Sequence, residues 1–126
     1  MKTELKKNNL WIVVWMICIA GVGIASIIPS FSPPHQFDMV LHFGCYFFLT
    51  AIPLAFFVRR EVAFLSVGCM PPLGLALEYI QTSINGRNFS PEDMIANNLG
   101  AAAGIVIGIL FRLFRKENRI KRQQDA

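Results

Sequence analysis

Four long apolar blocks constrain the fold of this chain more than any other feature. They cover residues about 10–28, 39–58, 62–81 and 94–114. Each block has about 20 residues, and a helix rising about 1.5 Å per residue then crosses the roughly 30 Å hydrocarbon layer of a bilayer. Backbone polar groups find no water in that layer, so such blocks span it as helices. We therefore predict an all-α fold, a membrane-embedded bundle of four transmembrane helices forming a single domain over residues 1–126.

The composition agrees with lipid as the solvent. Hydrophobic residues make up 54% of the chain and charged residues only 16%, against about 25% charged in an average soluble domain. A soluble fold would have too little polar surface to cover this apolar mass. The three cysteines, Cys18, Cys45 and Cys69, lie far apart inside apolar blocks, which indicates neither a disulfide framework nor a zinc motif.

Positive charge predicts the orientation of the bundle. The chain has 12 Lys and Arg residues, and all except Arg87 lie before the first block, between the second and third, or at the end of the fourth and beyond it. Basic loops stay on the cytoplasmic side, so we expect both termini in the cytoplasm and a multi-pass protein of the cytoplasmic (inner) cell membrane. The C-terminal basic run is better explained by anionic lipid than by nucleic acid, and no nucleic-acid partner is expected.

Proline and glycine predict local features of the helices. Pro29, Pro33 and Pro34 follow the first block and end it, while Pro71-Pro72 predicts a kink near the middle of the third helix. The first block is too long for the apolar region of a signal peptide, so we predict an uncleaved helix. Gly100, Gly104 and Gly108 line one face of the fourth helix. Such a face lets the backbone of another helix approach closely, and it is the surface through which we expect a homo-oligomer to form.

Polar residues at the block ends carry the functional signal, because burying an ionisable group in a membrane is costly without a partner. Asp38, His42 and Tyr46 follow one another at four-residue spacing, which places them on one face of the second helix. Glu78 and Gln81 lie three residues apart at the end of the third helix. Both groups are therefore expected at the outer end of the bundle.

The start of the fourth helix adds to this outer end. Asp93 and Asn97 lie four residues apart there, and Arg87 lies in the loop before them. Together with the residues of the second and third helices, they predict an outer pocket that combines carboxylates, an imidazole, a guanidinium and amides. This convergence is the strongest indication of function in the sequence.

Purely structural roles compete with this interpretation. Asp38 and Asp93 are each suited to cap a helix N-terminus, although Ser90 followed by Pro91 is a competing start for the fourth helix. Glu78 and Arg87 could form a structural ion pair. Capping does not explain His42, Glu78 or Gln81, so a purely structural set is the weaker explanation.

The order of these residues resembles the VanZ-like family of small membrane proteins over about residues 37–104. The matching motifs are Asp38-x-x-x-His42-Phe43-x-x-Tyr46, Glu78-x-x-Gln81, Arg87, Ser90 and Asp93-x-x-x-Asn97-x-x-Gly100. Met39 departs from the family, in which a basic residue often follows the aspartate. The resemblance implies a cell-envelope membrane protein, and the namesake of the family is linked to resistance to the glycopeptide teicoplanin.

Two functions follow from the predicted pocket. In the first, the protein binds or modifies a lipid head group or a lipid-linked cell-wall precursor. The resemblance to the VanZ-like family adds an expected effect on glycopeptide susceptibility. Arg87 would contact phosphate, and the full ligand-binding set would be Asp38, His42, Tyr46, Glu78, Gln81, Arg87, Asp93 and Asn97.

The second function is an intramembrane hydrolase or transferase that acts on such a lipid. Its catalytic residues would be His42, Asp38, Glu78 and Asp93. These groups are able to hold a divalent metal, or His42 could act as a general base. The sequence requires no cofactor and has no H-E-x-x-H motif. Transport ranks third, because the inner halves of the helices are almost wholly apolar.

Overall fold

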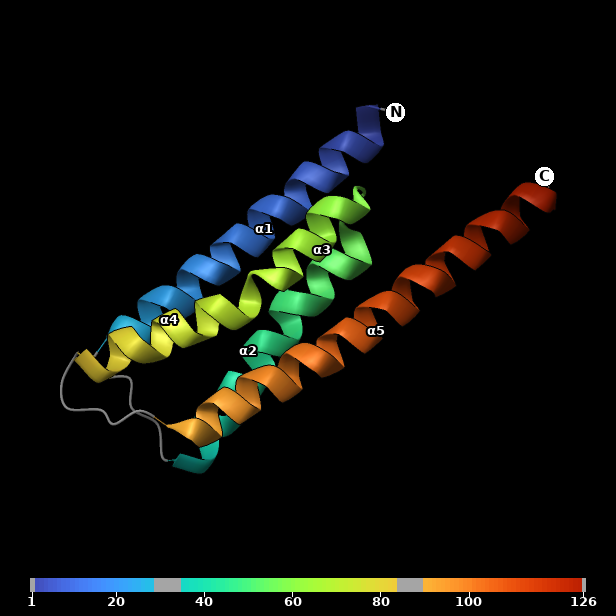
Figure 1. Cartoon of the computed structure of the whole chain (residues 1–126). Helices are drawn as coiled ribbons and strands as arrows, with labels where there is room; N and C mark the ends of the chain where they lie inside the picture. The colour runs from blue at the N-terminus through green and yellow to red at the C-terminus, as the bar shows by residue number, and fades with distance from the viewer. Residues whose placement is uncertain (1, 29–34, 84–89, 126) are drawn as a thin grey trace.

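The computed structural model describes residues 2–28, 35–83 and 90–125. Within them the chain forms helices only, and no strand is present (Figure 1). The helices are α1 (Lys2–Ile27), α2 (His35–Phe56), α3 (Arg60–Gly68), α4 (Met70–Ser83) and α5 (Pro91–Gln124). Four stretches are long and apolar enough to cross a membrane, and α3 with α4 forms the third of them. The prediction of an all-α chain with four such helices is confirmed.

The helices run up and down, so the elements divide between two ends of the bundle. The starts of α2 and α5 and the end of α4 lie at one end (Figure 1). The Lys2 end of α1, the connection between α2 and α3, and the Gln124 end of α5 lie toward the other. The predicted pocket residues that the structure describes therefore belong to one end, and the basic segments of α1 and α5 belong to the opposite end.

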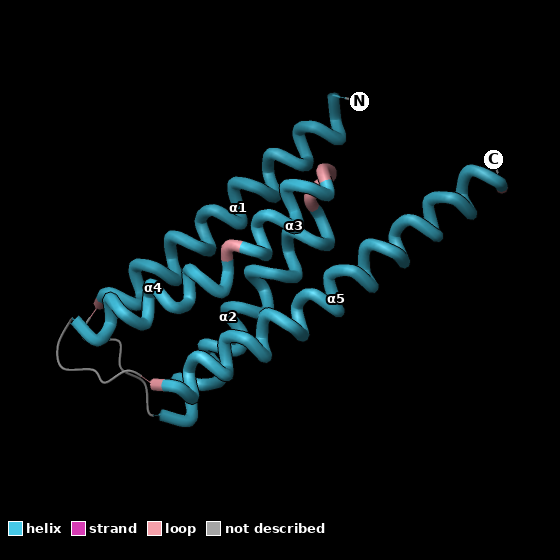
Figure 2. Tube along the Cα trace, in the orientation of Figure 1, coloured by secondary structure: helices cyan, strands magenta, loops and turns pink. Residues whose placement is uncertain are grey.

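The third span is broken where proline predicted a kink. α3 ends at Gly68, α4 begins at Met70, and a short loop separates them (Figure 2). Pro71 and Pro72 have no N–H to donate to the preceding turn, and their rings crowd its carbonyls. The Leu73 amide donates to the Cys69 carbonyl at 3.1 Å, so helical hydrogen bonding resumes directly after the two prolines.

Three helices are longer than the apolar blocks. α1 begins at Lys2, α2 at His35, and α5 continues to Gln124. The extensions of α1 and α5 consist largely of Lys, Arg, Glu and Gln, which favour helix in water as well as in lipid. Glu117 and Lys121 also form an i,i+4 ion pair at 2.7 Å. The hydropathy pattern located the spans, but helix propensity decides where the helices end.

The closest packing joins α2 to α5. Gly100 and Gly104 lie directly on the α2 backbone, because a Cβ atom at either position would overlap a carbonyl oxygen, that of Phe43 or of Phe47. The Thr50 hydroxyl donates to the Ala101 carbonyl at 3.1 Å across the same contact. The glycines that the sequence offered to a homo-oligomer are therefore used for packing within the chain, as small residues do between membrane helices.

The opposite end of this pair is fixed by arginine. Arg112 donates to the Phe57 carbonyl, and Arg115 donates to the Ala55 carbonyl at 3.2 Å. The last carbonyls of α2 have no partner within the helix, and a cation beside them is favourable. The contact between α2 and α5 is thus held by the two glycines and Thr50 along its length and by the two arginines at its far end.

α1 attaches through the first half of its length. The Trp15 indole N–H donates to the Leu49 carbonyl at 2.8 Å, and the Asn8 side chain accepts from the Val58 amide at 2.8 Å. The Trp11 ring stacks on Phe56 with centroids 4.0 Å apart. These contacts hold α1 against the end of α2 that lies away from the polar residues.

Replacing glycine by alanine should change the stability of the protein in opposite directions at two positions. In a helix, Gly→Ala is ordinarily stabilising by about 1 kcal/mol. Gly23→Ala should show this gain, because no atom lies within 4 Å of the added Cβ. Gly104→Ala should instead lower stability by about 1–3 kcal/mol, because the Cβ forces α5 away from α2. Thermal unfolding in detergent measures both, and stabilisation by Gly104→Ala would contradict the observed packing.

Candidate functional site

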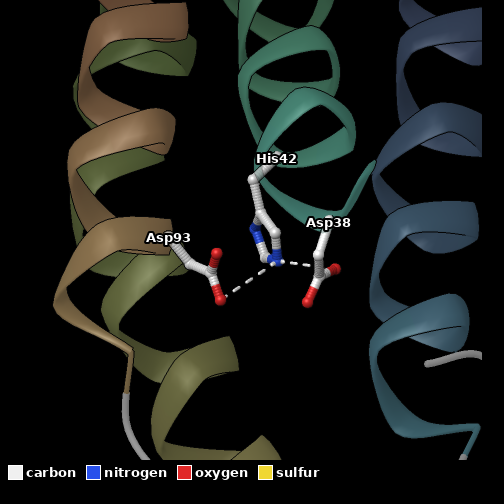
Figure 3. Close-up of side chains that lie close together, drawn as sticks. All are labelled: Asp38, His42 and Asp93. Carbon is white, nitrogen blue, oxygen red and sulfur yellow. Dashed lines mark ion pairs between the residues drawn. The ribbon is translucent and has the colours of Figure 1, made fainter. Parts of the chain in front are cut away.

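The core of the site is His42, which lies between two aspartates (Figure 3). Its Nε2 atom is 3.6 Å from Oδ1 of Asp38, one turn earlier on α2, and 4.0 Å from Oδ2 of Asp93 on α5. Its Nδ1 atom is 3.0 Å from Oδ1 of Asn97. The i,i+4 spacings on both helices and the close packing of α2 on α5 bring these four side chains together.

The contact with Asn97 determines the charge pattern around His42. An amide oxygen can only accept a hydrogen bond, so Nδ1 is the donor to Asn97. Nε2 then faces two carboxylates. A bare nitrogen lone pair is repelled by carboxylate oxygens, and a metal ion between Nε2 and the two carboxylates would replace this repulsion with attraction. Asp38, His42 and Asp93 offer three ligand atoms that all lie within 4.8 Å of one another.

The start of α5 leaves the Asp93 carboxylate available. Ser90 is the N-cap, because its hydroxyl accepts from the Asp93 amide at 3.2 Å, and Pro91 takes the first helical position. The capping role considered for Asp93 is therefore wrong. Asp93 is only 4% exposed, and its Oδ1 atom has no hydrogen-bond partner among the described residues.

Asp38 is also not an N-cap. α2 begins at His35, so Asp38 lies within the first turn and not before it. The carboxylate is still favourably placed there, because the N-terminal end of a helix attracts negative charge. The side chain of Asp38 is 15% exposed, compared with 5% for Asp93.

Glu78 links α4 to the site. Its Oε1 atom accepts from the Ser90 amide at 2.8 Å, so the carboxylate holds the start of α5 against the end of α4. Its Oε2 atom is buried without a hydrogen-bond partner among the described residues. The ion pair predicted between Glu78 and Arg87 involves a residue outside the described part of the chain, as does every role given to Arg87.

A cavity of about 760 Å³ adjoins these side chains. Residues of α1, α2 and α4 form most of its wall, and most of them are apolar or small. Its polar residues include Asp38, His42, Tyr46, Glu78, Gln81 and Asn97. The structure thus places every described residue of the predicted binding set in the cavity wall or, for Asp93, beside His42.

Tyr46 adds a buried hydroxyl to this wall. The residue is 3% exposed, and its hydroxyl has no hydrogen-bond partner among the described residues. The ring packs on Gly74 of α4, where a Cβ atom would lie 2.8 Å from the hydroxyl oxygen. Gly74 therefore lets Tyr46 reach across to α4, a role that the sequence did not reveal.

Sequence reasoning also missed the α1 side of the cavity. Cys18, Gly21, Val22, Ala25 and Ser26 line it. The only signal was the small size of several of these residues, which is common in membrane helices and says little about a cavity. Their contribution depends on how α1 lies against α2, and local spacing does not determine that.

Comparisons with known proteins supply one relative. No family model matches the chain, and no solved structure matches it. The uncharacterized protein C11E3.10 of Schizosaccharomyces pombe is 31% identical over 115 residues, which cover 89% of this chain and 68% of that protein. With this identity over most of both lengths, the chain belongs to the same family as the S. pombe protein.

Proposed function

We propose that this chain is a multi-pass protein of the cytoplasmic membrane, VanZ-like, that binds the head group of a membrane lipid in the cavity beside His42. Both termini lie in the cytoplasm in this proposal, and the cavity then opens at the depth of the outer head groups. The basic segments at the opposite end of the bundle support that orientation by the positive-inside rule.

The observation that carries the proposal is the composition of the cavity wall. Its volume of about 760 Å³ is within the range of about 300–1,000 Å³ typical of small-molecule sites. Apolar residues such as Leu49 and Ile52 occur in the same wall as the charged Asp38 and Glu78. A molecule with an acyl chain and a polar head matches both chemistries, and membrane lipid is such a molecule.

Unpartnered polar atoms support a polar ligand at this position. The Tyr46 hydroxyl and Glu78 Oε2 both belong to residues of the cavity wall and lack partners among the described residues. A buried polar group without a hydrogen bond costs about 1–3 kcal/mol. A head group that offers donors and acceptors would remove this cost. A lipid-linked cell-wall precursor is the member of this class that would connect the chain to glycopeptide susceptibility.

Catalysis on the bound lipid is the second candidate function. The observation that favours it is the position of His42 Nε2 between Asp38 and Asp93, since a carboxylate next to an imidazole orients the ring for proton transfer. A hydrolase or transferase would use His42 with Asp38, Asp93 and Glu78 around the head group.

Filling the cavity tests lipid binding. Gly21 lines the cavity and has no atom within 4 Å of an added Cβ, so Gly21→Phe should occupy the space without disturbing the helix. We expect the lipid that copurifies with the protein, measured by mass spectrometry, to fall at least several-fold. Gly23→Phe is the matched control, because Gly23 has the same free space and does not line the cavity. Equal lipid content in both variants would contradict the proposal.

Orientation is tested by thiol labelling in a variant without Cys18, Cys45 and Cys69. A membrane-impermeant maleimide should label Ser83→Cys, at the end of α4, in intact cells. Gln124→Cys, at the end of α5, should react only after the membrane is permeabilised. The reverse pattern would overturn the proposed orientation and leave the fold unchanged.

Catalysis is tested by lipid turnover in reconstituted vesicles. Wild-type protein should convert the lipid that copurifies with it, and His42→Ala should reduce the rate at least about 100-fold, as expected for loss of a general base. Turnover that is absent from the wild type, or equal in both proteins, would eliminate the enzyme and leave the binding function in place.

A further inference from the structure

We propose that Asp38, His42 and Asp93 bind one divalent metal ion at the polar end of the lipid cavity, with Asn97 as the residue that positions His42. Asp38 and His42 lie one turn apart on α2, and Asp93 and Asn97 lie in the first turns of α5. The glycine contact fixes these two helices against each other. No ligand comes from a connecting loop.

The distances suit a metal after a small contraction. The three ligand atoms lie within 4.8 Å of one another. Donors on opposite sides of an ion at about 2.1 Å would be about 4.2 Å apart. Binding would therefore draw the Asp38 and Asp93 carboxylates toward His42 Nε2.

Asp93 provides independent support for a ligand at this position. Its side chain is 5% exposed, Oδ2 faces His42 Nε2, and Oδ1 has no hydrogen-bond partner among the described residues. A buried carboxylate without hydrogen bonds costs several kcal/mol, so such groups are ordinarily paired or coordinate a metal. The helix cap does not use this side chain, because Ser90 caps α5.

Asn97 gives His42 the tautomer that a metal needs. Metal-bound histidines donate their second ring N–H to an oxygen, which fixes the ring and leaves the other nitrogen free for the ion. His42 has this arrangement, with Nδ1 3.0 Å from Asn97 Oδ1 and Nε2 facing both aspartates.

The donor set indicates the class of ion. One imidazole nitrogen and two carboxylate oxygens suit Mn²⁺, Fe²⁺ or Zn²⁺ better than Mg²⁺ or Ca²⁺, which favour oxygen alone. Three protein ligands also leave coordination positions open for water or a bound molecule.

A metal ion at this position would indicate which lipid head groups the cavity accepts. This conclusion rests on the proposed function. Asp38 and His42 belong to the cavity wall. Two carboxylates repel a phosphate, but a divalent ion between them neutralises their charge and offers a direct bond to a phosphate oxygen. A phosphate-bearing head group is therefore the lipid chemistry that fits this end of the cavity.

The test measures metal bound by tag-free protein in detergent. Protein is stripped with a chelator and dialysed against Mn²⁺ or Zn²⁺, and bound metal is counted by mass spectrometry. Wild-type protein should hold one ion per chain. Asn97→Ala should weaken binding about 10–100-fold, and Asp93→Asn, which keeps the size of the side chain but removes the charge of a direct ligand, should weaken it more. His42→Ala should remove it.

Matched controls come from the neighbouring positions. Glu92→Gln changes the same charge one residue before Asp93, and Asn98→Ala removes an exposed amide next to Asn97. Both should bind metal like the wild type. Helix content by circular dichroism confirms that each variant folds. Fewer than about 0.1 ions per wild-type chain, or equal loss in Asp93→Asn and Glu92→Gln, would overturn the metal site.

The outcomes for metal and lipid are distinguishable. Metal binding is measured without added lipid, and lipid content is measured in Gly21→Phe and Gly23→Phe. Protein that loses lipid in Gly21→Phe but binds no metal keeps the proposed function and refutes the ion. Protein that binds one ion while Gly21→Phe retains all its lipid keeps the ion and refutes the lipid cavity.

Discussion

The close contact of α2 with α5 determines the rest of the structure. Gly100 and Gly104 allow the two backbones to touch, and this fixes how far one helix is shifted along the other. His42 with Asn97 and Phe57 with Arg112 are both separated by 55 positions, at opposite ends of the same contact. The helices are therefore parallel and in constant register over their shared length. A side chain replacing either glycine would separate the backbones, and the His42 group would separate with them.

The spacing of residues along the chain predicted much of the site. The rest depends on how α2 and α5 are aligned along each other, which the sequence did not show. Four-residue repeats placed Asp38 with His42 and Asp93 with Asn97 on helix faces, and the number of spans placed these pairs at one end. Spacing within a helix cannot show which turn of α5 lies beside His42, because that depends on side chains of both helices. The α1 wall of the cavity was unpredictable for the same reason. Helix ends were misjudged because hydropathy reports the lipid boundary and not the last helical residue.

The buried charges are unusual for a small membrane bundle, whose helices gain little from burying polar groups. Glu78 and Asp93 are 3% and 4% exposed, and each has an oxygen without a hydrogen-bond partner among the described residues. Only one oxygen of Glu78 has a structural use, the hydrogen bond to the Ser90 amide. If packing alone had shaped this end, apolar residues of similar volume would serve as well or better. The proposed head group and metal ion would supply the missing partners of these two oxygens.

The way α1 is attached leaves space for the cavity at the polar end of the bundle. Asn8, Trp11 and Trp15 hold the first half of α1 against α2. Beyond them, Gly21 and Ala25 contribute to the cavity wall. Small side chains near the end of α1 leave space that larger ones would fill, while the aromatic anchors keep the helix attached. Residues of α1, α2 and α4 line the cavity, so in the proposed function the acyl chain would lie among these three helices, with the head group near His42 and Asp38.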